Sequence, residues 1–352
     1  MTKDVYQRDL LKTAAVTGGV SLAGHTLQGR SLAQESTEIP EAERVVITVI
    51  TDNFADALRE DYKIAKRFSA TNESPLEAVM IHAEHGLAYH VETTVDGQPH
   101  SFLFDFASNG SGVRRNIELL QIDLKKIEAI ALSHDHVDHQ SALIELLKAK
   151  RGEIPQKIPF YVGERFFAGT YARTADNRVV SLQALKREDV EGLGMVRIVE
   201  VKTPMPIVRG AYLTGKIERV TDYEKIASVF VAKRGDQFVQ EEFIGEQAIV
   251  MNVKGKGLVV LSGCAHRGIV NTIRHAQKIT GIGKVHAVIG GCHLTGAKPE
   301  VIQQTIADIK ALGPDYVVPT HCTGFEAIAA FAREMPDQFI LNTAGTRYTI
   351  SA

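Results

Sequence analysis

The segment 134–139 reads His-Asp-His-Val-Asp-His and carries three imidazoles and two carboxylates within six residues. These groups cannot all lie in an apolar core, because buried polar groups without partners are costly. Two interpretations remain. The segment is a solvated loop of mixed charge, or it is a metal site in which His134 and His136, alternating on an extended stretch, reach one ion while Asp138 and His139 face a second. We favour the metal site.

Further ligands are expected at the ends of neighbouring strands, because one short loop offers too few donors for two ions. His266 follows the apolar run 257–263, and His321 follows the apolar run 316–320. Ligands converge at such strand ends in layered α/β proteins. The pattern therefore predicts one ion held by His134, His136 and His266, and a second held by Asp138, His139 and His321.

The elements that must position these residues follow from the alternation of apolar and amphipathic segments. Strands that end at charged motifs and are followed by helices indicate a layered α/β fold. The middle of the chain, at about 151–245, is richer in charge and less regular, and we interpret it as an insertion that borders the active site. The expected strands are 45–50, 87–95, 102–106, 129–133, 247–253, 257–263, 285–291 and 316–320, and the expected helices are 141–150, 269–279 and 300–312.

Composition limits the classes of partner. The chain has 352 residues, of which 44% are hydrophobic and 23% charged, which are ordinary values for a globular protein. Because Lys+Arg number 40 and Asp+Glu number 42, no broad basic surface is expected, and nucleic acid is not expected as a partner. A small-molecule substrate is expected instead, and the oligomeric state is not determined. Three cysteines, an odd number, do not form a disulfide framework.

The first 34 residues have the features of an export signal. Lys3, Arg8 and Lys12 precede a mildly apolar run at 13–24, and Ser31-Leu32-Ala33 forms a small-x-small cleavage pattern. Segment 7–12 is similar to a twin-arginine signal, although Gln7 stands where the first arginine belongs. We expect a signal peptide at 1–34, a periplasmic protein and a mature domain at 41–352, the alternative being an uncleaved amphipathic helix. No run reaches the length needed to span a bilayer, so an integral membrane segment is not expected.

The histidine motif, the later strand-end histidine and the final Pro-Thr-His together resemble the metallo-β-lactamase superfamily. The resemblance covers about 45–350 and extends to one branch, that of 7,8-dihydropterin-6-yl-methyl-4-(β-D-ribofuranosyl)aminobenzene 5′-phosphate synthase. It implies a four-layer αββα sandwich with a metal-bound hydroxide at its edge. It also implies zinc, as two ions, with iron or manganese as alternatives. The matching segments are 51–53, 83–87, 103–106, 132–139, 214–219, 246–250, 257–271, 289–294 and 319–324.

Three positions depart from the pattern of that branch. Asp105 is followed by Phe106-Ala107 where Thr-Gly is usual, the segment 140–142 reads Gln-Ser-Ala where two glycines are usual, and Gly245 replaces a common aspartate. These changes leave the predicted ligands intact, but they weaken any inference of substrate from the branch, since one fold hosts many activities.

Several residues near the motif have open roles. Cys264 stands where many members of the superfamily bridge two metals with an aspartate, and it is a thiolate ligand, a buried neutral thiol or a bystander. Asp105 is expected to organise the motif loop by accepting hydrogen bonds. His293 is placed equally well to contact the substrate, to contact another metal ligand, or to bind the metal itself. Arg267, like Lys216 and Arg219, either holds an anionic group of the substrate or forms an ordinary surface ion pair.

Hydrolysis is the first function hypothesis. Two ions can hold a hydroxide near neutral pH and polarise the oxygen of an ester, lactone or phosphoester, with Asp138 orienting the nucleophile as the catalytic residue. A transferase acting on a pterin-like alcohol is the second hypothesis, taken from the name of the branch. A non-hydrolytic iron or redox protein is the third. Flavin-containing diiron members of the superfamily have an acidic residue where this chain has His136, which counts against the third.

Overall fold

The computed structural model describes residues 39–182 and 185–352, and the segments 1–38 and 183–184 lie outside the described residues. The export signal expected at 1–34 falls in the first of these segments and stays a prediction. No helix in the part of the chain that is described combines the length and the apolar character needed to cross a bilayer.

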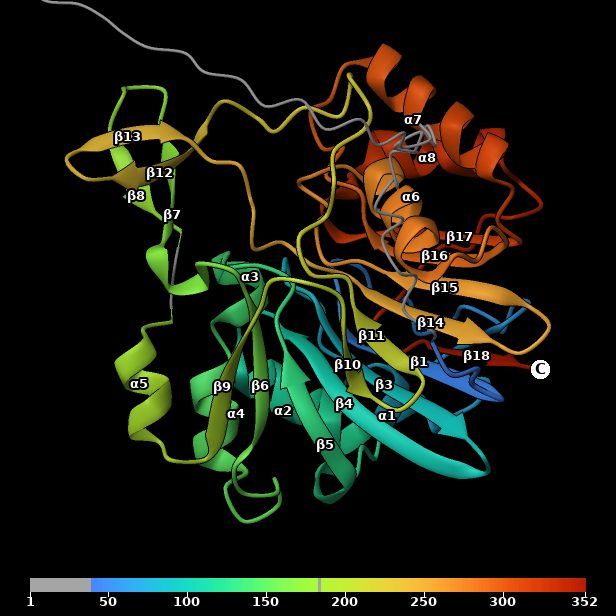
Figure 1. The fold of residues 1–352 in the computed structure, drawn as a ribbon. Coiled ribbons are helices and arrows are strands. Elements are labelled where there is room, and N and C mark those ends of the chain that lie inside the picture. Colours follow the sequence, from blue (N-terminus) through green and yellow to red (C-terminus); the bar gives the residue numbers. More distant parts are fainter. Residues whose placement is uncertain (1–38, 183–184) are drawn as a thin grey trace, which may run out of the picture. The chain divides into compact units, whose positions relative to one another are not determined.

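Two large sheets contain most of the strands (Figure 1). The first has eight strands in the order β2-β18-β1-β3-β4-β5-β6-β9, and the second has six in the order β10-β11-β14-β15-β16-β17. In the first sheet the bounds are β1 Arg44–Thr51, β2 Ala65–Lys66, β3 Ala88–Val95, β4 Gln98–Phe106, β5 Ile127–Ala131, β6 Ile158–Gly163, β9 Val196–Val201 and β18 Arg347–Ser351. In the second they are β10 Met205–Val208, β11 Ala211–Leu213, β14 Ile249–Val253, β15 Gly257–Leu261, β16 Val285–Gly291 and β17 Tyr316–Thr320.

The two sheets face each other across a buried apolar core, which arises from the two-residue period of their strands. On β4, Phe102 and Phe104 point into this core, whereas Leu103 points to the opposite face. On β15, Val259 and Leu261 enter the same core from the second sheet. Apolar side chains on both faces of a strand require a layer on each side of its sheet.

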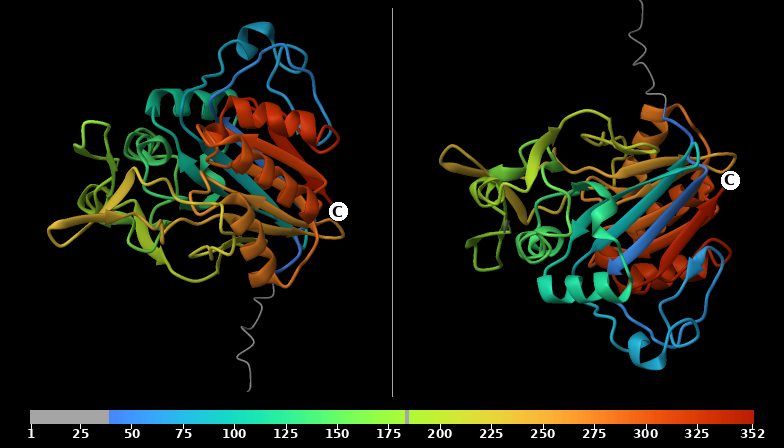
Figure 2. Two further views of the ribbon diagram at one scale, coloured as in Figure 1. Left: turned by 90° about the horizontal axis from the view of Figure 1, so that it is seen from above. Right: turned by 90° about the horizontal axis from the view of Figure 1, so that it is seen from below.

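Helices supply those outer layers. Apolar residues of α2 (Gly110–Leu119) and α4 (Leu143–Ala149) pack against the outer face of the first sheet. Helices α6 (Ile269–Thr280), α7 (Pro299–Leu312) and α8 (Phe325–Glu334) cover the second sheet (Figures 1 and 2). The order helix, sheet, sheet, helix is the αββα sandwich expected from the sequence, so the predicted fold class is confirmed.

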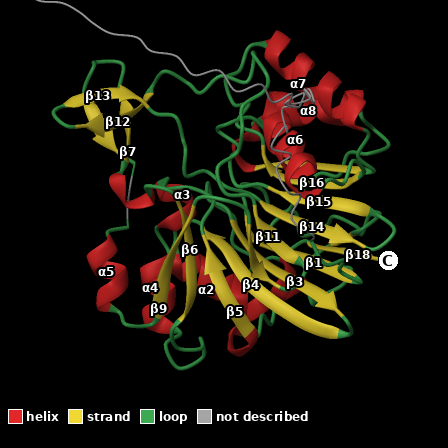
Figure 3. Ribbon diagram, in the orientation of Figure 1, coloured by secondary structure: helices red, strands yellow, loops and turns green. Residues whose placement is uncertain are grey.

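A third sheet of four short strands, in the order β13-β12-β7-β8, lies outside the two main sheets (Figure 3). It is built from parts of the span 151–245, whereas β6, β9, β10 and β11 from the same span belong to the main sheets. The strand bounds are β7 Thr170–Arg173, β8 Val179–Ser181, β12 Phe230–Arg234 and β13 Gln237–Gln240. The remaining short helices are α1 Pro75–Ala78, α3 Val137–Gln140 and α5 Arg187–Gly192, with 3₁₀ turns at Leu124–Lys126, Phe166–Ala168 and His321–Thr323.

Candidate metal centre

The predicted ligands come from loops that follow parallel strands. Strand β5 leads into the motif 134–139, β15 into Cys264 and His266, β16 into His293, and β17 directly into His321. The pairs β15–β16 and β16–β17 are parallel, so their carboxyl ends lie at one edge of the second sheet. The structure therefore brings together residues that are up to 187 positions apart, from His134 to His321.

The three histidines predicted to hold the first ion form one buried group. The ring centroids of His134 and His136 lie 4.6 Å apart, and those of His136 and His266 also lie 4.6 Å apart. The Nε2 atoms of His134 and His266 approach to 3.2 Å. At this distance either one nitrogen donates a hydrogen bond to the other, or both are placed to bind one cation.

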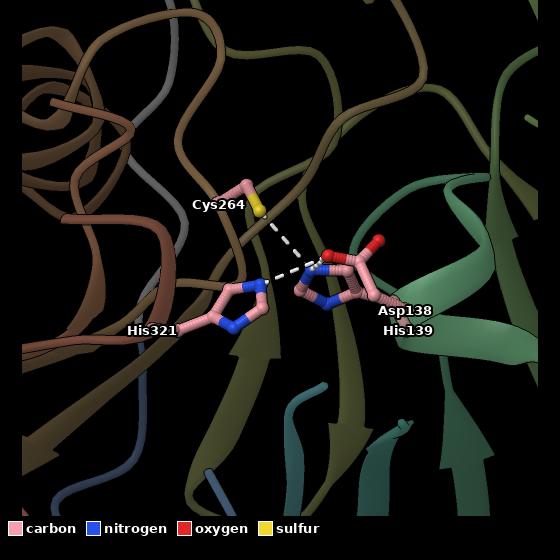
Figure 4. A group of neighbouring side chains, drawn as sticks. All are labelled: Asp138, His139, Cys264 and His321. Atoms are coloured by element: carbon pink, nitrogen blue, oxygen red, sulfur yellow. Dashed lines mark hydrogen bonds and ion pairs between the residues drawn. The ribbon is translucent and has the colours of Figure 1, made fainter. Parts of the chain in front are cut away.

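The three residues predicted to hold the second ion also meet. Oδ2 of Asp138 lies 3.2 Å from Nε2 of His321 and 3.9 Å from Nε2 of His139. The Sγ atom of Cys264 is 3.0 Å from the same nitrogen of His139. Figure 4 shows these four side chains directed toward a common point. The structure thus brings the six side chains into one buried cluster. The ligand atoms of His134 and His266 form a close group with Cys264 that does not include His136, and metal binding with its division into two sets stays a prediction.

The donor atoms of this centre have the chemistry that a divalent cation requires. Burial lowers the pKa of His136 to about 3 and holds those of His134 and His266 well below the ordinary value, so these rings are neutral and offer lone pairs. Burial raises the pKa of Asp138, but His139 and His321 outweigh burial and hold it well below its usual range. Nε2 of His136 is buried and has no hydrogen-bond partner among the described residues. A cation would satisfy that nitrogen.

Asp105 lies at the end of β4, and its carboxylate holds the motif loop 134–139 in place. Its carboxylate, which is fully buried, accepts hydrogen bonds from the Ser133 backbone N–H at 2.7 Å and from the Ser133 hydroxyl at 2.8 Å. Its Oδ2 also lies 2.7 Å from Nδ1 of His139. Burial lowers the pKa of His139, but Asp105 and Asp138 outweigh burial and raise it to about 9. Asp105 thereby keeps a proton on Nδ1 and directs Nε2 toward the centre.

Glu246 fixes the loop that carries His266. Its two carboxylate oxygens accept the backbone N–H groups of His266 at 2.6 Å and of Arg267 at 2.7 Å. Burial raises the pKa of Glu246 to about 7. Ala265, just before, adopts the left-handed region with a φ of 57°, which turns the chain so that His266 faces the motif. Glu246 was not named as a functional residue from the sequence, although it begins the segment 246–250, which matches the branch.

Arg267 lies in the interior. It is 6% exposed, and its guanidinium donates to the backbone carbonyls of Ile217, at 2.6 Å, and of Glu242. The alternative of a surface ion pair is therefore wrong for Arg267. Arg219, by contrast, is exposed and pairs with Glu242 at 3.5 Å.

Cys264 and His293 lie within the centre. His293 is half-buried, and its ring centroid is 4.0 Å from that of His266. Cys264 is 2% exposed, and Sγ of Cys322 lies 3.6 Å from its carbonyl oxygen. All three cysteines are free, in agreement with the expectation that they do not form a disulfide framework.

Three further residues border the centre and were missed in the sequence. Nε2 of His85 lies 3.5 Å from Oδ2 of Asp138, and the ring of His85 stacks on His321 at 4.8 Å. The ring of Phe243 stacks on that of His266 with 4.1 Å between the ring centroids. The ring centroid of Phe230 lies 5.1 Å from those of both His136 and His266. His85 precedes a strand instead of following one, and an isolated phenylalanine is no signal of a site.

Cavities flank the cluster on two sides. A small one, of about 30 Å³, adjoins His134, Phe243 and Gly245. A larger one, of about 480 Å³, adjoins Asn53 and His321 and is lined mainly by apolar side chains. Gly245 packs so closely that a Cβ there would lie 2.3 Å from the carbonyl oxygen of Glu164. The aspartate common in the branch therefore cannot fit at 245 unless the backbone shifts.

Comparisons with known proteins agree with this geometry. A search of family models returns no match. The solved structure of Tm1679, a metal-dependent hydrolase of the β-lactamase superfamily, superposes with a TM-score of 0.68 over 88% of this chain and 100% of that chain, at 23% identity. At that identity the likeness concerns the fold alone.

Sequence relatives are more informative. The 7,8-dihydropterin-6-methyl-4-(β-D-ribofuranosyl)-aminobenzene-5′-phosphate synthase of Methanocaldococcus jannaschii is 34% identical over 260 residues, which are 73% of this chain and 87% of the relative. An uncharacterized protein of the same organism is 25% identical over 259 residues, 71% of this chain and 88% of its own length. The chain belongs to the metallo-β-lactamase superfamily, in the branch of that synthase, as the resemblance of its motifs predicted.

Proposed function

We propose that this protein is a metal-dependent hydrolase that cleaves an ester, lactone or phosphoester bond of a small molecule. The observation that carries the proposal is the buried convergence of three neutral imidazoles and one ionised carboxylate, with Nε2 of His136 left without a hydrogen-bond partner among the described residues. A cluster of this kind is unfavourable without a cation, because its donors face one another and have lost their contacts with water.

Different residues have different roles in the proposed reaction. The two groups described above would hold the ions, which when bound supply a nucleophile from water near neutral pH and polarise the oxygen under attack. Asp138 reaches His321 and His139 with the same oxygen, and its side chain is 17% exposed. It is therefore placed both to bind metal and to orient water. Phe230 and Phe243 exclude bulk solvent from the histidines behind them.

The 34% identical synthase favours a second candidate, a group transfer to an organic acceptor such as a pterin-like alcohol. That candidate needs a pocket for a large planar acceptor. The cavity of about 480 Å³ beside His321 is large enough for one. The proposed export signal and the departures at 106–107 and 245 argue against a biosynthetic step inside the cell. The iron or redox alternative has no observation in its favour beyond the ligand set itself.

The test is a substrate screen of protein reconstituted with zinc, manganese or ferrous iron. Chromogenic carboxylic esters, lactones, phosphomonoesters and phosphodiesters should include at least one class that is turned over, with loss of activity on chelation and recovery on metal addition. Reaction in ¹⁸O-labelled water should place the label in the product. Absence of label, together with turnover only when a pterin alcohol is added, would establish group transfer and refute hydrolysis.

A further inference from the structure

Cys264 occupies a special place among the candidate ligands. Its Sγ lies with the ligand atoms of Asp138, His139 and His321 in a group whose members are all within 4.8 Å of one another. The same Sγ forms a second such group with His134 and His266. Cys264 thus lies beside all three residues of the second predicted site and beside two of the three residues of the first.

We propose that Cys264 binds metal as a thiolate shared by the two ions. The inference rests on the proposed metal-dependent function and deepens it by naming a soft ligand between the sites. In tetrahedral coordination, two ligand atoms at 2.0–2.3 Å from one ion lie about 3.5 Å apart. The 3.0 Å between Sγ and Nε2 of His139 is close to this spacing.

The backbone holds Cys264 firmly in this position. A Cβ at Gly263 would lie 2.1 Å from Oγ of Ser133 and 3.0 Å from Oδ2 of Asp105, so the loop packs directly against the network that orients His139. On the other side, Ala265 has a φ of 57° and Glu246 binds the following N–H groups. A side chain fixed from both ends suits a ligand, because little entropy is lost when the ion binds.

The competing explanation is a neutral thiol that donates to His139. The 3.0 Å distance also permits this hydrogen bond, and burial raises the pKa of the Cys264 thiol in the absence of metal. A divalent cation reverses that preference, since a coordinating thiol is deprotonated outright. The two explanations therefore differ in whether the Cys264 sulfur loses its proton and binds metal when metal is added.

Two other cysteines provide matched controls. Cys322 is buried beside Cys264 and forms a third group with Cys264 and His293, but it belongs to neither of the two predicted sites. Cys292 is also buried, and it is in none of the candidate groups among the described residues. Replacement of each by serine changes one sulfur atom at a comparable depth.

The experiment is a cobalt(II) titration of the metal-free full-length chain, followed by absorption spectroscopy. A thiolate on cobalt gives a sulfur-to-metal charge-transfer band in the near ultraviolet, independent of any substrate. We expect the band in wild type, in Cys322→Ser and in Cys292→Ser, and its loss in Cys264→Ser. If both ions share the sulfur, the band should grow or shift during the second equivalent of cobalt as well as the first.

A Cys264→Asp variant keeps the test decisive if the serine variant fails to fold. It should bind two cobalt ions without the band, and Cys264→Ser should bind them at least about tenfold more weakly than wild type. Two bound ions without the band in wild type, a band that survives in Cys264→Ser, or a band complete after one equivalent would each overturn the shared thiolate while leaving the metal-dependent function standing. Failure of wild type to bind any metal would refute both.

Discussion

At the scale of single residues, the centre is defined by the direction in which each imidazole presents its free nitrogen. The Nε2 atoms of His134 and His266 are 3.2 Å apart, so at most one of them can carry a proton between them. His139 differs, because Asp105 accepts from its Nδ1 at 2.7 Å and fixes the tautomer. One carboxylate, Asp138, balances part of the charge that a pair of ions would bring.

Replacement of Asp138 by alanine should remove a ligand and the group that orients water. We expect turnover to fall at least about 100-fold and one ion to be lost, while the apolar core between the sheets keeps the chain folded. His293→Ala should have a milder effect, since His293 belongs to neither predicted site. Metal content, thermal unfolding and activity measured side by side would check this. Full metal and full activity in Asp138→Ala would refute the two-ion hydrolase.

The Asp105→Asn variant tests whether Asp105 determines which ring nitrogen of His139 carries the proton. An amide nitrogen in place of Oδ2 would face Nδ1 of His139, and the ring would relieve the clash by moving its proton to Nε2, where it blocks metal. We expect about 10–100-fold weaker metal binding with little change in fold. Asp123→Asn, at an exposed turn, serves as the control. Equal metal affinity in the two variants would show that the Asp105 contact has no role in binding.

At the scale of elements, the backbone is left-handed at several residues other than glycine where the strands end and in the loops that follow them. Such conformations cost about 1–2 kcal/mol in residues other than glycine, so they persist only where surrounding contacts impose them. Here the contacts come from Asp105, Glu246 and the close packing at Gly263. The residues concerned are Asp105, Ala107, Ala265, His293 and His321.

Strand β3 contains a titratable group that affects stability away from the centre. Burial, with a smaller contribution from Arg347, lowers the pKa of His90 to about 4 from an ordinary 6.5. The unfolded chain therefore takes up a proton between pH 6.5 and 4 that the folded chain does not, and stability falls as the pH falls through that window. The full effect is roughly 3 kcal/mol.

His90→Gln should remove that contribution. In metal-free protein, the difference in unfolding free energy between the variant and wild type should shift in favour of the variant as the pH is lowered from 7 to about 4.5. Chemical denaturation at several pH values would measure it. Parallel curves for the two proteins across this range would show that burial of His90 does not contribute to acid lability.

At the scale of the whole molecule, the centre joins the two halves of the sandwich. His134 follows β5 of the first sheet, whereas His266 and His321 follow β15 and β17 of the second. Ions bound between these loops would couple the sheets, because they bind the folded chain and not the separated strands.

Metal should therefore raise thermal stability, and the gain should grow with the logarithm of the metal concentration above the dissociation constant. At 100 times the dissociation constant the gain is about 2.7 kcal/mol, which corresponds to several degrees in Tm. Unfolding scans with chelator and with graded zinc would measure the shift, and Asp138→Ala should respond less than wild type. A Tm that is unaffected by chelator and by zinc would contradict a metal centre at this interface.

The sequence by itself determined the layers and the six candidate ligands. Strands such as 285–291 and 316–320 were predicted because alternation and flanking helices are local properties, and the motif 134–139 has a spacing that leaves few alternatives. The position of His266 and His321 at strand ends was enough to group them with the motif, since parallel strands end at a common edge.

Only the tertiary structure decided how the remaining residues meet. The place of Cys264 between the two groups, the contact of His85 with Asp138 and the burial of Arg267 depend on contacts between segments far apart in the chain. Strand periodicity says which face a side chain occupies, but the distance between two loops on different sheets follows from how those sheets pack. For that reason the candidate donors could be named from spacing, whereas the position of Cys264 between them could not.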